Sequence, residues 1–303
     1  MPSLRRHAPD VWLVPSDVGR IEVGAPVVAI VHGAAWPLEP DFFDYVPHAF
    51  AESSIAAVEA TLASASFAIA PSEYTRRGIA ATGHMEPEQV TVVPHGVDLD
   101  AFGAARAGGR DQVERALGRP LPYVLFASIP SIRQKNLGAL RAAMDRLVAA
   151  GRPHALVIAG GTAGGESAEE LAAIDAELSA TPGRVAWLGH VDDHALAGLM
   201  AECAAFCLPS LFEAFGLTAL EAMACGAPVV VSARGALPEV VGDAGIVAPP
   251  TPAELEGALA RVLDDPALAA SLGAAARSRA ETMSWSRTAD GWLAVLEDAA
   301  TAD

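Results

Sequence analysis

The sequence carries little positive charge. Of its 303 residues, 20 are lysine or arginine and 37 are aspartate or glutamate, which gives a formal net charge of −17 at pH 7. A chain this acidic is repelled by nucleic acid, and neither half has the basic stripe that binds anionic lipid. We therefore expect no nucleic-acid partner and no stable membrane anchoring.

Cysteine and long apolar runs are scarce too. The three cysteines, Cys203, Cys207 and Cys225, are too few and too clustered for a disulfide framework, which predicts free thiols. Apolar runs such as 26–31 and 227–231 are far shorter than the ~20 residues that cross a bilayer. The start also lacks the charged segment, apolar stretch and cleavage site of a secretory signal. Together these absences predict a cytoplasmic protein.

Hydrophobic residues, by contrast, make up 52% of the chain, and from about residue 120 they form short apolar segments that alternate with helical stretches. Strands that are apolar throughout and alternate with helices form a parallel sheet with both faces covered. This pattern predicts a doubly wound α/β domain. The expected strands are 122–128, 154–160, 184–188, 204–208, 228–232 and 245–247.

Helices are expected between these strands. Asn136 can cap a helix that ends at Ala150, and Asp192 can cap one that ends near Glu202. The remaining helices are expected over 167–180, 216–225 and 237–241, and two more at the C-terminal end.

The first 100 residues show a weaker alternation of the same kind. Strands are expected over 10–15, 26–31, 67–70 and 90–93, and helices over 50–65 and 73–82, the second capped by Ser72. Glycine and proline in residues 97–120 predict a linker. We therefore expect an N-terminal Rossmann-like domain over 1–105, a second one over 106–284, and a C-terminal helix, 285–303, that packs back across them.

Two glutamates frame the start of one expected helix. Glu213 follows a strand, the helix begins near 215–218, and Glu221 comes more than a turn later. A helix start at the carboxyl end of a parallel strand presents unpaired N–H groups that suit an anion such as a diphosphate. Glu221 can then accept hydrogen bonds from a ribose diol, and Glu213 from a second polyol. Alternatively, Glu221 is a surface helix residue and Glu213 only stabilises the helix start.

A second candidate site contains the only lysine. Lys135 lies in Arg133-Gln-Lys-Asn136, after the first strand of the expected second domain, and the other 19 basic residues are all arginine. A compact ammonium at this point can stabilise a departing diphosphate, a task that side chains must perform if no metal is present. The alternative is a residue beside a helix cap that binds no ligand.

Histidines supply weaker candidates. His32 directly follows the apolar strand 26–31, where a histidine can be an ordinary polar residue or a functional one with pH-linked behaviour. His190 and His194 are four residues apart, but no third ligand is near, so we expect no metal site.

The stretch from Pro209 to Pro228, which contains both glutamates, resembles the signature of family 4 glycosyltransferases. The resemblance is strong over about 120–290 and moderate over about 25–100. It continues in Gly189-His-Val-Asp-Asp, Leu237-Pro-Glu-Val-Val, Asp243-Ala-Gly, Met283-Ser-Trp-Ser-Arg, Ala70-Pro-Ser-Glu and Val93-Pro-His-Gly-Val-Asp98.

The resemblance implies the GT-B fold, in which two Rossmann-like doubly wound parallel-sheet domains face a cleft. It also implies a retaining, metal-independent hexosyltransferase without a cofactor. The donor would be a UDP- or GDP-linked sugar of mannose or glucose type, transferred to a hydroxyl by a same-face mechanism. We expect a small-molecule or glycan acceptor.

The resemblance assigns roles to particular residues. Glu221 would bind the donor ribose, Glu213 the hydroxyls of the transferred sugar, and His32 would face that sugar. The expected catalytic set is thus His32, Lys135 and Glu213. The expected donor-binding set is Arg133, Val191, Phe215, Gly216, Leu217, Thr218 and Glu221, with Val191 in the loop that contacts the base and 215–218 at the diphosphate.

The sequence departs from the family in two respects. An arginine usually ends the strand before the lysine, but Ala127-Ser-Ile stands there, so either Arg133 has taken its place or one positive charge is missing. The N-terminal domain lacks the opening strand and Gly-rich loop, which predicts an incomplete domain from a late start or a genuine short form. With a late start the missing segment would complete the enzyme, whereas in a genuine short form the acceptor site would be reduced, or completed by an oligomer or partner subunit. The alternatives to a transferase function are an accessory nucleotide-sugar-binding subunit and, with little support, a nucleotide-sugar epimerase.

Overall fold

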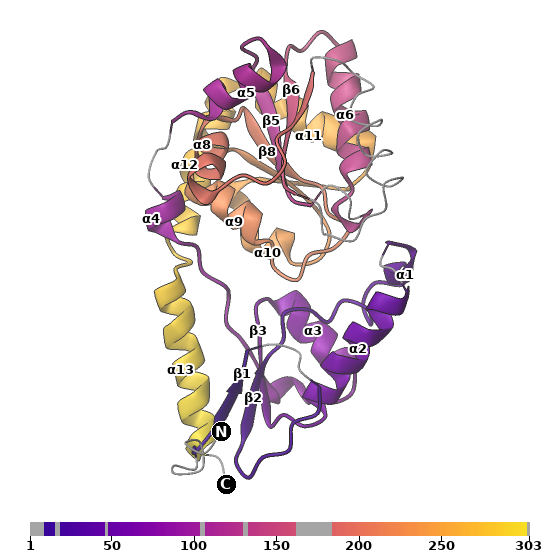
Figure 1. Cartoon of the computed structure of the whole chain (residues 1–303), viewed down its shortest axis with the longest axis vertical. Coiled ribbons are helices and arrows are strands. Elements are labelled where there is room, and N and C mark those ends of the chain that lie inside the picture. The colour runs from indigo at the N-terminus through magenta and orange to yellow at the C-terminus, as the bar shows by residue number, and fades with distance from the viewer. Residues whose placement is uncertain are drawn as a thin grey trace. The chain divides into compact units, whose positions relative to one another are not determined.

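The computed structural model describes residues 9–15, 19–45, 48–103, 107–129, 133–161 and 184–301. The chain divides into two compact units, each built on one parallel sheet (Figure 1). Unit 1 comprises residues 1–96 and 285–303, and unit 2 comprises residues 97–284. The expected helix 167–180 lies outside the described residues.

The sheet of unit 1 has four parallel strands in the order β1-β2-β3-β4. They are β1 (Trp12–Val14), β2 (Val27–Ile30), β3 (Phe67–Ala70) and β4 (Val90–Val92). The register places Val28 opposite Phe67 and Ala68 opposite Val90. All four strands coincide with segments expected from the sequence.

Side chains alternate across this sheet, as strand geometry requires. Ala29 and Val31 pack with residues of α2 (His48–Leu62) and α3 (Glu73–Ala81), whereas Val28 and Ile30 pack with residues of α13 (Trp285–Thr301). Figure 1 shows α13 on one side of the strands and α2 and α3 on the other. The short helix α1 (Phe42–Tyr45) and a 3-10 turn, η1 (Pro87–Gln89), complete the described elements of this unit. Ser72 caps α3 as expected, because its hydroxyl accepts a hydrogen bond from the Thr75 N–H.

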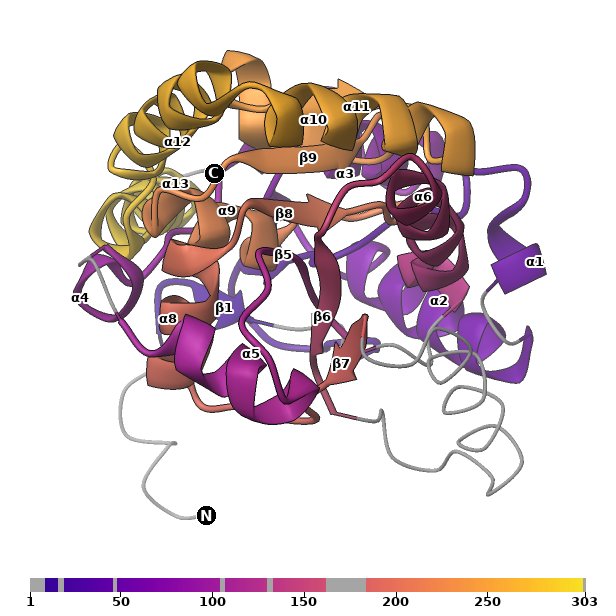
Figure 2. The same cartoon turned by 90° about the horizontal axis from the view of Figure 1, so that it is seen from above.

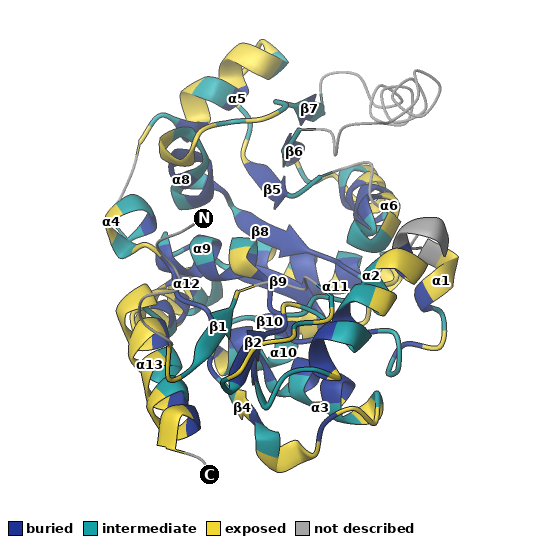
Figure 3. Ribbon diagram, turned by 60° about the horizontal axis from the view of Figure 1, so that its bottom comes forward, coloured by how far each residue is buried: buried dark blue, intermediate teal, exposed yellow. Residues whose placement is uncertain are grey.

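The sheet of unit 2 has six parallel strands in the order β10-β9-β8-β5-β6-β7. They are β5 (Tyr123–Ala127), β6 (Ala155–Ala159), β7 (Val185–Trp187), β8 (Ala205–Leu208), β9 (Val229–Ser232) and β10 (Ile246–Ala248). Every residue of β5, β6, β8 and β9 is buried, which confirms a sheet covered on both faces (Figure 3). The chain runs outward from β5 to β7 and then returns to β8 on the other side of β5. The strand order therefore reverses between β5 and β8.

Helices cover both faces of this sheet. On one face α6 (Leu137–Ala149) packs against α11 (Pro252–Asp264), and on the other α5, α8, α9 and α12 pack in series (Figure 2). The bounds of that series are α5 (Gly109–Leu117), α8 (Asp193–Glu202), α9 (Leu217–Ala224) and α12 (Pro266–Ala280). The shorter elements are α4 (Leu99–Phe102), α10 (Leu237–Val241) and the 3-10 turns η2 (Arg133–Lys135) and η3 (Gly242–Ala244).

The segment 97–120 is not the linker that its glycines and proline suggested. It contains α4 and α5, and both Phe102 and Val113 are buried in the core of unit 2. Gly109 explains the packing, because a Cβ there would come within 2.4 Å of the Gly198 carbonyl oxygen of α8. The glycine is therefore explained by the close contact between α5 and α8, and not by a flexible linker. Three helices, α11, α12 and α13, follow the last strand, where two were expected.

Candidate functional site

The sequence-predicted residues of unit 2 gather at one edge of its sheet. Parallel strands end at the same edge, and in doubly wound sheets ligands bind where the strand order reverses. In unit 2 that point lies between β5 and β8. The segment 133–136 follows β5 and the segment 209–216 follows β8, so the fold itself brings Lys135 and Glu213 to the reversal point.

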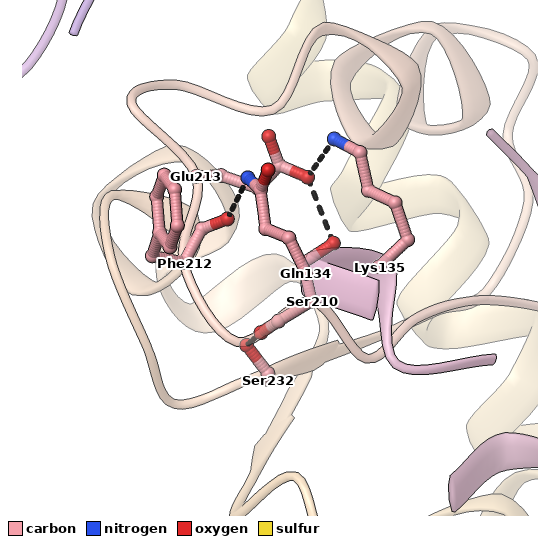
Figure 4. A network of polar contacts seen from close by, with 6 residues as sticks. All are labelled: Gln134, Lys135, Ser210, Phe212, Glu213 and Ser232. Carbon is pink, nitrogen blue, oxygen red and sulfur yellow. Dashed lines mark hydrogen bonds and ion pairs between the residues drawn. The ribbon is translucent and has the colours of Figure 1, made fainter. Parts of the chain in front are cut away.

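Lys135 and Glu213 form an ion pair (Figure 4). The Lys135 ammonium donates to Glu213 Oε1 at 2.7 Å, and the Ser210 hydroxyl donates to the same oxygen at 2.8 Å. The two charged side chains are only 17% and 14% exposed. A charge pair this far from water is costly to break, because the remaining partner would be left uncompensated. From the sequence alone, separate roles are expected for these two residues and their contact is not predicted.

The loop that carries Glu213 is held from the β5 side by the residues around Lys135. The Gln134 side-chain amide donates to the Phe212 carbonyl at 2.8 Å (Figure 4). The Leu211 N–H donates back to the Gln134 carbonyl at 2.8 Å. These reciprocal bonds lock the two loops together. The position of Glu213 relative to Lys135 therefore does not depend on their ion pair alone.

Asn136 contributes to the same framework in an unexpected way. It stands at the N-cap position of α6, but its φ is +56° and its side chain does not cap the helix. Its amide donates instead to the carbonyls of Pro209 and Pro250, at 3.1 and 3.0 Å. The expected cap is therefore wrong. The left-handed backbone, which asparagine tolerates better than most residues, turns the amide toward two other loops.

The loop after β9 holds Glu213 from the opposite side. The Ser232 hydroxyl donates to the Ser210 carbonyl (Figure 4). The Ala236 N–H donates to the Glu213 carbonyl at 2.8 Å. Gly235 has a φ of +64°, and a Cβ there would lie 2.5 Å from both the Glu213 nitrogen and its carbonyl oxygen. Only glycine fits this approach without displacing the loop.

The N-terminus of α9 comes three residues after Glu213. Gly216 is its N-cap, with a φ of +109°, and its carbonyl accepts from the N–H groups of Ala219 and Leu220. The first N–H groups of a helix have no intrahelical acceptor, so those of Leu217 and Thr218 are donors suited to an anion. Phe215 is buried in the core and anchors this turn.

Glu221 lies one turn into α9 and is half-buried. Burial raises the pKa of its carboxyl from the ordinary 4.5 to about 7, and the negative charge of Asp193 adds to the effect. A carboxyl whose pKa is strongly shifted by partial burial is a candidate functional-site residue. Glu221 therefore remains a candidate for binding the donor.

Arg133 and Val191 are less constrained. Arg133 is exposed and lies in the same 3-10 turn, η2, as the paired Lys135. Val191 is partly buried in the turn between β7 and α8, just before Asp192, whose carboxylate caps α8 through the Ala195 N–H at 2.8 Å. The cap is as expected.

His32 belongs to unit 1, where it follows β2 and is exposed. Its Nε2 lies 2.8 Å from the Pro15 carbonyl oxygen, and its ring centroid lies 5.5 Å from that of His95. The sequence did not single out His95, although it lies within a stretch that carries the family resemblance.

The cysteines are free, and Cys203 and Cys207 are buried, so desolvation raises the pKa of both thiols. Across the described part of the chain, no group of three or more His, Cys, Asp and Glu side chains is placed to hold a metal ion. No helix in the same residues has the length and apolar character needed to cross a membrane.

Several residues of the site were missed by sequence reasoning. Ser210, Gln134 and Asn136 lie inside stretches already singled out, so their proximity to Glu213 and Lys135 was the available signal. Ser232 and Gly235 carried no such signal, because their role depends on the packing of the loop after β9 against the loop after β8.

Two family models match the chain. The model of the family described as glycosyl transferases group 1 matches residues 110–279, more than half of the chain. The chain belongs to this family. The model described as Glycosyltransferase Family 4 matches residues 3–101.

Curated relatives are glycosyltransferases. A D-inositol 3-phosphate glycosyltransferase of Mycobacterium avium is 37% identical over 221 residues, which cover 70% of this chain and 50% of the relative. An MMP alpha-(1->4)-mannosyltransferase of Mycolicibacterium hassiacum is 46% identical over 114 residues, which cover 36% of this chain and 28% of the relative. The chain spans about half the length of the first of these relatives.

Solved structures agree on the fold. Anabaena HepE in complex with UDP matches with a TM-score of 0.74 at 21% identity, covering 90% of this chain and 72% of that one. Sucrose-phosphate synthase of Thermosynechococcus elongatus matches with a TM-score of 0.73 at 24% identity, covering 91% and 68%. This group 1 glycosyl transferase therefore has the GT-B fold, with two Rossmann-like α/β units.

Proposed function

We propose that the chain is a retaining glycosyltransferase that moves a hexose of mannose or glucose type from a nucleotide-diphosphate sugar to a hydroxyl acceptor. The observation that carries the proposal is the Lys135–Glu213 pair at the strand-order reversal of unit 2, where Glu213 lies three residues before Gly216, the N-cap of α9. This arrangement would supply an ammonium group, a helix N-terminus that can bind an anion, and a carboxylate that can accept hydrogen bonds from sugar hydroxyls. All three lie within one short stretch of the fold.

The donor would bind along this edge. The N–H groups at the start of α9, from Phe215 to Thr218, would hold the diphosphate, and Glu221 would accept hydrogen bonds from the ribose diol. Val191 would lie in the turn that contacts the base, and Arg133 would add a second positive charge near the diphosphate. The base is proposed to be uracil or guanine.

Glu213 retains the capacity to bind sugar hydroxyls in spite of its ion pair. The contacts of its carboxylate within the described residues fall on Oε1, which accepts from Lys135 and Ser210. Oε2 can therefore accept hydrogen bonds from the transferred sugar. The pair positions the carboxylate before the substrate arrives, which is what preorganised sites require.

Lys135 has spare donors as well. An ammonium carries three N–H groups, and one of them is used on Glu213. The others can bind the diphosphate oxygens, where negative charge grows as the donor bond breaks. Because this charge would be supplied by a side chain, we propose that transfer needs no divalent metal ion.

The chemical step would occur on one face of the sugar. The bond between C1 and the diphosphate oxygen breaks, and its electron pair remains on that oxygen. The acceptor oxygen forms a new bond to C1 on the same face, and its proton passes to the departing phosphate oxygen. His32, which follows β2 in unit 1, is proposed to contact the substrate.

Relatives guide the choice of substrates. The relatives include a D-inositol 3-phosphate glycosyltransferase and a mannosyltransferase, which favours a small polyol or glycan acceptor. A structural neighbour was solved in complex with UDP-glucose, which favours testing UDP-linked donors beside GDP-linked ones.

The test is calorimetric titration of the chain with UDP, GDP, UDP-glucose and GDP-mannose, first with EDTA and then with Mg²⁺. Selective binding of one nucleotide that is unchanged by Mg²⁺ supports the donor site. Sugar transfer should then be assayed with inositol 3-phosphate and simple glycans. Donor binding without transfer to any of these acceptors favours the alternative of an accessory subunit that binds nucleotide sugars. No binding to any nucleotide contradicts the proposed donor site.

A further inference from the structure

His32 is held by a hydrogen bond that water could easily replace. Both His32 and Pro15 are exposed, and the bond joins His32 Nε2 to the Pro15 carbonyl oxygen at 2.8 Å. A carbonyl oxygen only accepts, so Nε2 must carry the proton, and in the neutral ring Nδ1 is the acceptor. An exposed hydrogen bond contributes little by itself, because water competes for both partners. The other described interaction of this ring is its contact with His95.

His95 lies against His32 and is itself well fixed. Their ring centroids are 5.5 Å apart with a tilt of 32°, and on its other side His95 contacts the Trp285 indole at 5.7 Å with a tilt of 38°. His95 is 8% exposed, whereas Trp285 is 43% exposed. Tilted contacts of this kind between rings are favourable and directional.

The segment around His95 is anchored to the start of α13 and to the sheet. The Thr288 hydroxyl donates to the Pro94 carbonyl at 2.8 Å, and the Val93 N–H donates to the Ala70 carbonyl at 2.9 Å. Gly291 packs so closely on Val93 that a Cβ would come within 2.7 Å of the valine side chain. The segment that carries His95 is therefore held by contacts with both α13 and β3.

His95 is also neutral at physiological pH. Burial lowers the pKa of its imidazole to about 4, and the positive charge that His32 can carry lowers it further. A neutral ring can pack against His32 without repelling it in either protonation state of His32.

We propose that His95 is a positioning residue for His32: braced by Trp285, its buried ring keeps the His32 imidazole on the Pro15 carbonyl, with the proton on Nε2 and Nδ1 as the acceptor. The inference rests on the proposed function only in giving His32 a task at the substrate. A neutral Nδ1 can accept a hydrogen bond from a sugar hydroxyl, and a ring held in one orientation offers it there without an entropic cost at binding.

The test reads His32 directly by NMR of the ¹⁵N-histidine-labelled full chain at about pH 9, where ordinary imidazoles are neutral. In the wild type, His32 should show a protonated Nε2, an unprotonated Nδ1 and a slowly exchanging Nε2 proton. His95→Ala should speed exchange of that proton by about tenfold, which corresponds to about 1.4 kcal/mol. His95→Phe should restore slow exchange, because a neutral aromatic ring is retained. Exchange unchanged in His95→Ala overturns the proposal.

Controls separate positioning from general loss of structure. His84→Ala removes an exposed imidazole from the same unit and should leave the His32 signals unaltered. If His95→Ala does not fold, Trp285→Ala, at a largely exposed side chain, removes the brace and should also speed exchange. Wild-type exchange in that variant contradicts the role of Trp285. Because no turnover is measured, failure of sugar transfer leaves this result unaffected, and the two hypotheses fail separately.

Discussion

Three residues of unit 2 carry most of the proposed donor chemistry, and two kinds of interaction distinguish them. Lys135 and Glu213 are joined by a direct ion pair at 2.7 Å, whereas Glu221 is defined by desolvation. The first two are held in a ready geometry. Desolvation makes the charged form of Glu221 unfavourable, and hydrogen bonds from a ligand can offset this free-energy cost.

Changing the ion pair should separate diphosphate binding from sugar transfer. Lys135→Met should weaken nucleotide-diphosphate binding by about tenfold, because about 1.4 kcal/mol of charge-assisted bonding is lost. Glu213→Gln should leave nucleotide binding within a few-fold of wild type but reduce transfer by at least about a hundredfold, as expected for a group that orients the reacting sugar. Calorimetry and product release measure the two effects.

Arg133→Met is the matched control, because it also replaces a cation but at an exposed position. A loss of diphosphate binding equal to that of Lys135→Met would mean that Arg133 supplies the missing arginine of the family. If Glu213→Gln transfers sugar at the wild-type rate, Glu213 has no role in the reaction.

Glu221 should make nucleotide binding depend on pH. Its pKa of about 7 means that raising the pH from 6 to 8 converts the carboxyl to a carboxylate, which accepts the ribose hydroxyls better. Affinity should therefore increase over this interval, and Glu221→Gln should show a weaker affinity that does not change with pH. Titration of wild type, Glu221→Gln and the exposed control Glu114→Gln over this range provides the test, and a flat wild-type profile contradicts it.

At the scale of elements, the site depends on three loops that follow neighbouring strands. The loops after β5, β8 and β9 are cross-linked by the bonds of Gln134, Asn136, Ser232 and Ala236 to the backbone of residues 209–213. This framework fixes the backbone that carries Glu213. Its tightest point is Gly235.

Gly235→Ala should disturb the loop that carries Glu213. The new Cβ would meet the Glu213 backbone at 2.5 Å, and the φ of +64° adds strain for any residue with a side chain. We expect a loss of unfolding free energy of roughly 2–3 kcal/mol and a large fall in transfer. Denaturant unfolding and the transfer assay measure both.

Gly118→Ala distinguishes strain from the contact with Glu213. Gly118 has a similar φ of +71° in the same unit, but nothing lies within 4 Å of its Cβ position. This variant should lose only about 1 kcal/mol and keep its transfer activity. Equal effects of the two substitutions would mean that Gly235 acts through backbone strain alone.

At the scale of the whole molecule, the chain passes twice between its units, at 96/97 and at 284/285, so the last helix returns to the unit that contains the first strand. Each unit also contains a titratable group whose pKa is shifted by desolvation, and the two shifts have opposite directions. His95 in unit 1 has a lowered pKa, and Glu221 in unit 2 has a raised one.

The stability of the two units should therefore respond to pH in opposite directions. For His95, the unfolded chain binds more protons between its pKa of about 4 and the ordinary 6.5, so this group makes unit 1 less stable as the pH falls through that window. For Glu221, the folded chain binds more protons between 4.5 and about 7, so this group makes unit 2 less stable as the pH rises through it.

Hydrogen exchange, corrected for the intrinsic effect of pH and read separately on peptides from β2 and β3 and from β5 and β8, provides the measurement. His95→Phe should flatten the acid-side dependence of unit 1 only. Glu221→Gln should make unit 2 more stable at pH 8 by roughly 1–3 kcal/mol. If both variants change both units equally, the two effects cannot be assigned to these groups.

The local sequence pattern located the described strands and the helix caps at Ser72 and Asp192. It also singled out Lys135, Glu213 and Glu221 as candidate site residues. Periodicity, capping and position in the loop after a strand are properties of neighbouring residues, so the sequence alone was enough for these features. The Lys135–Glu213 contact joins residues 78 positions apart and exists because β8 returns to the side of β5. The same long-range packing turned Asn136 from a helix cap into a link between loops, made α4 and α5 part of unit 2, and buried His95 and, in part, Glu221. Strand order and desolvation depend on which distant segments meet, so only the tertiary structure could decide these features.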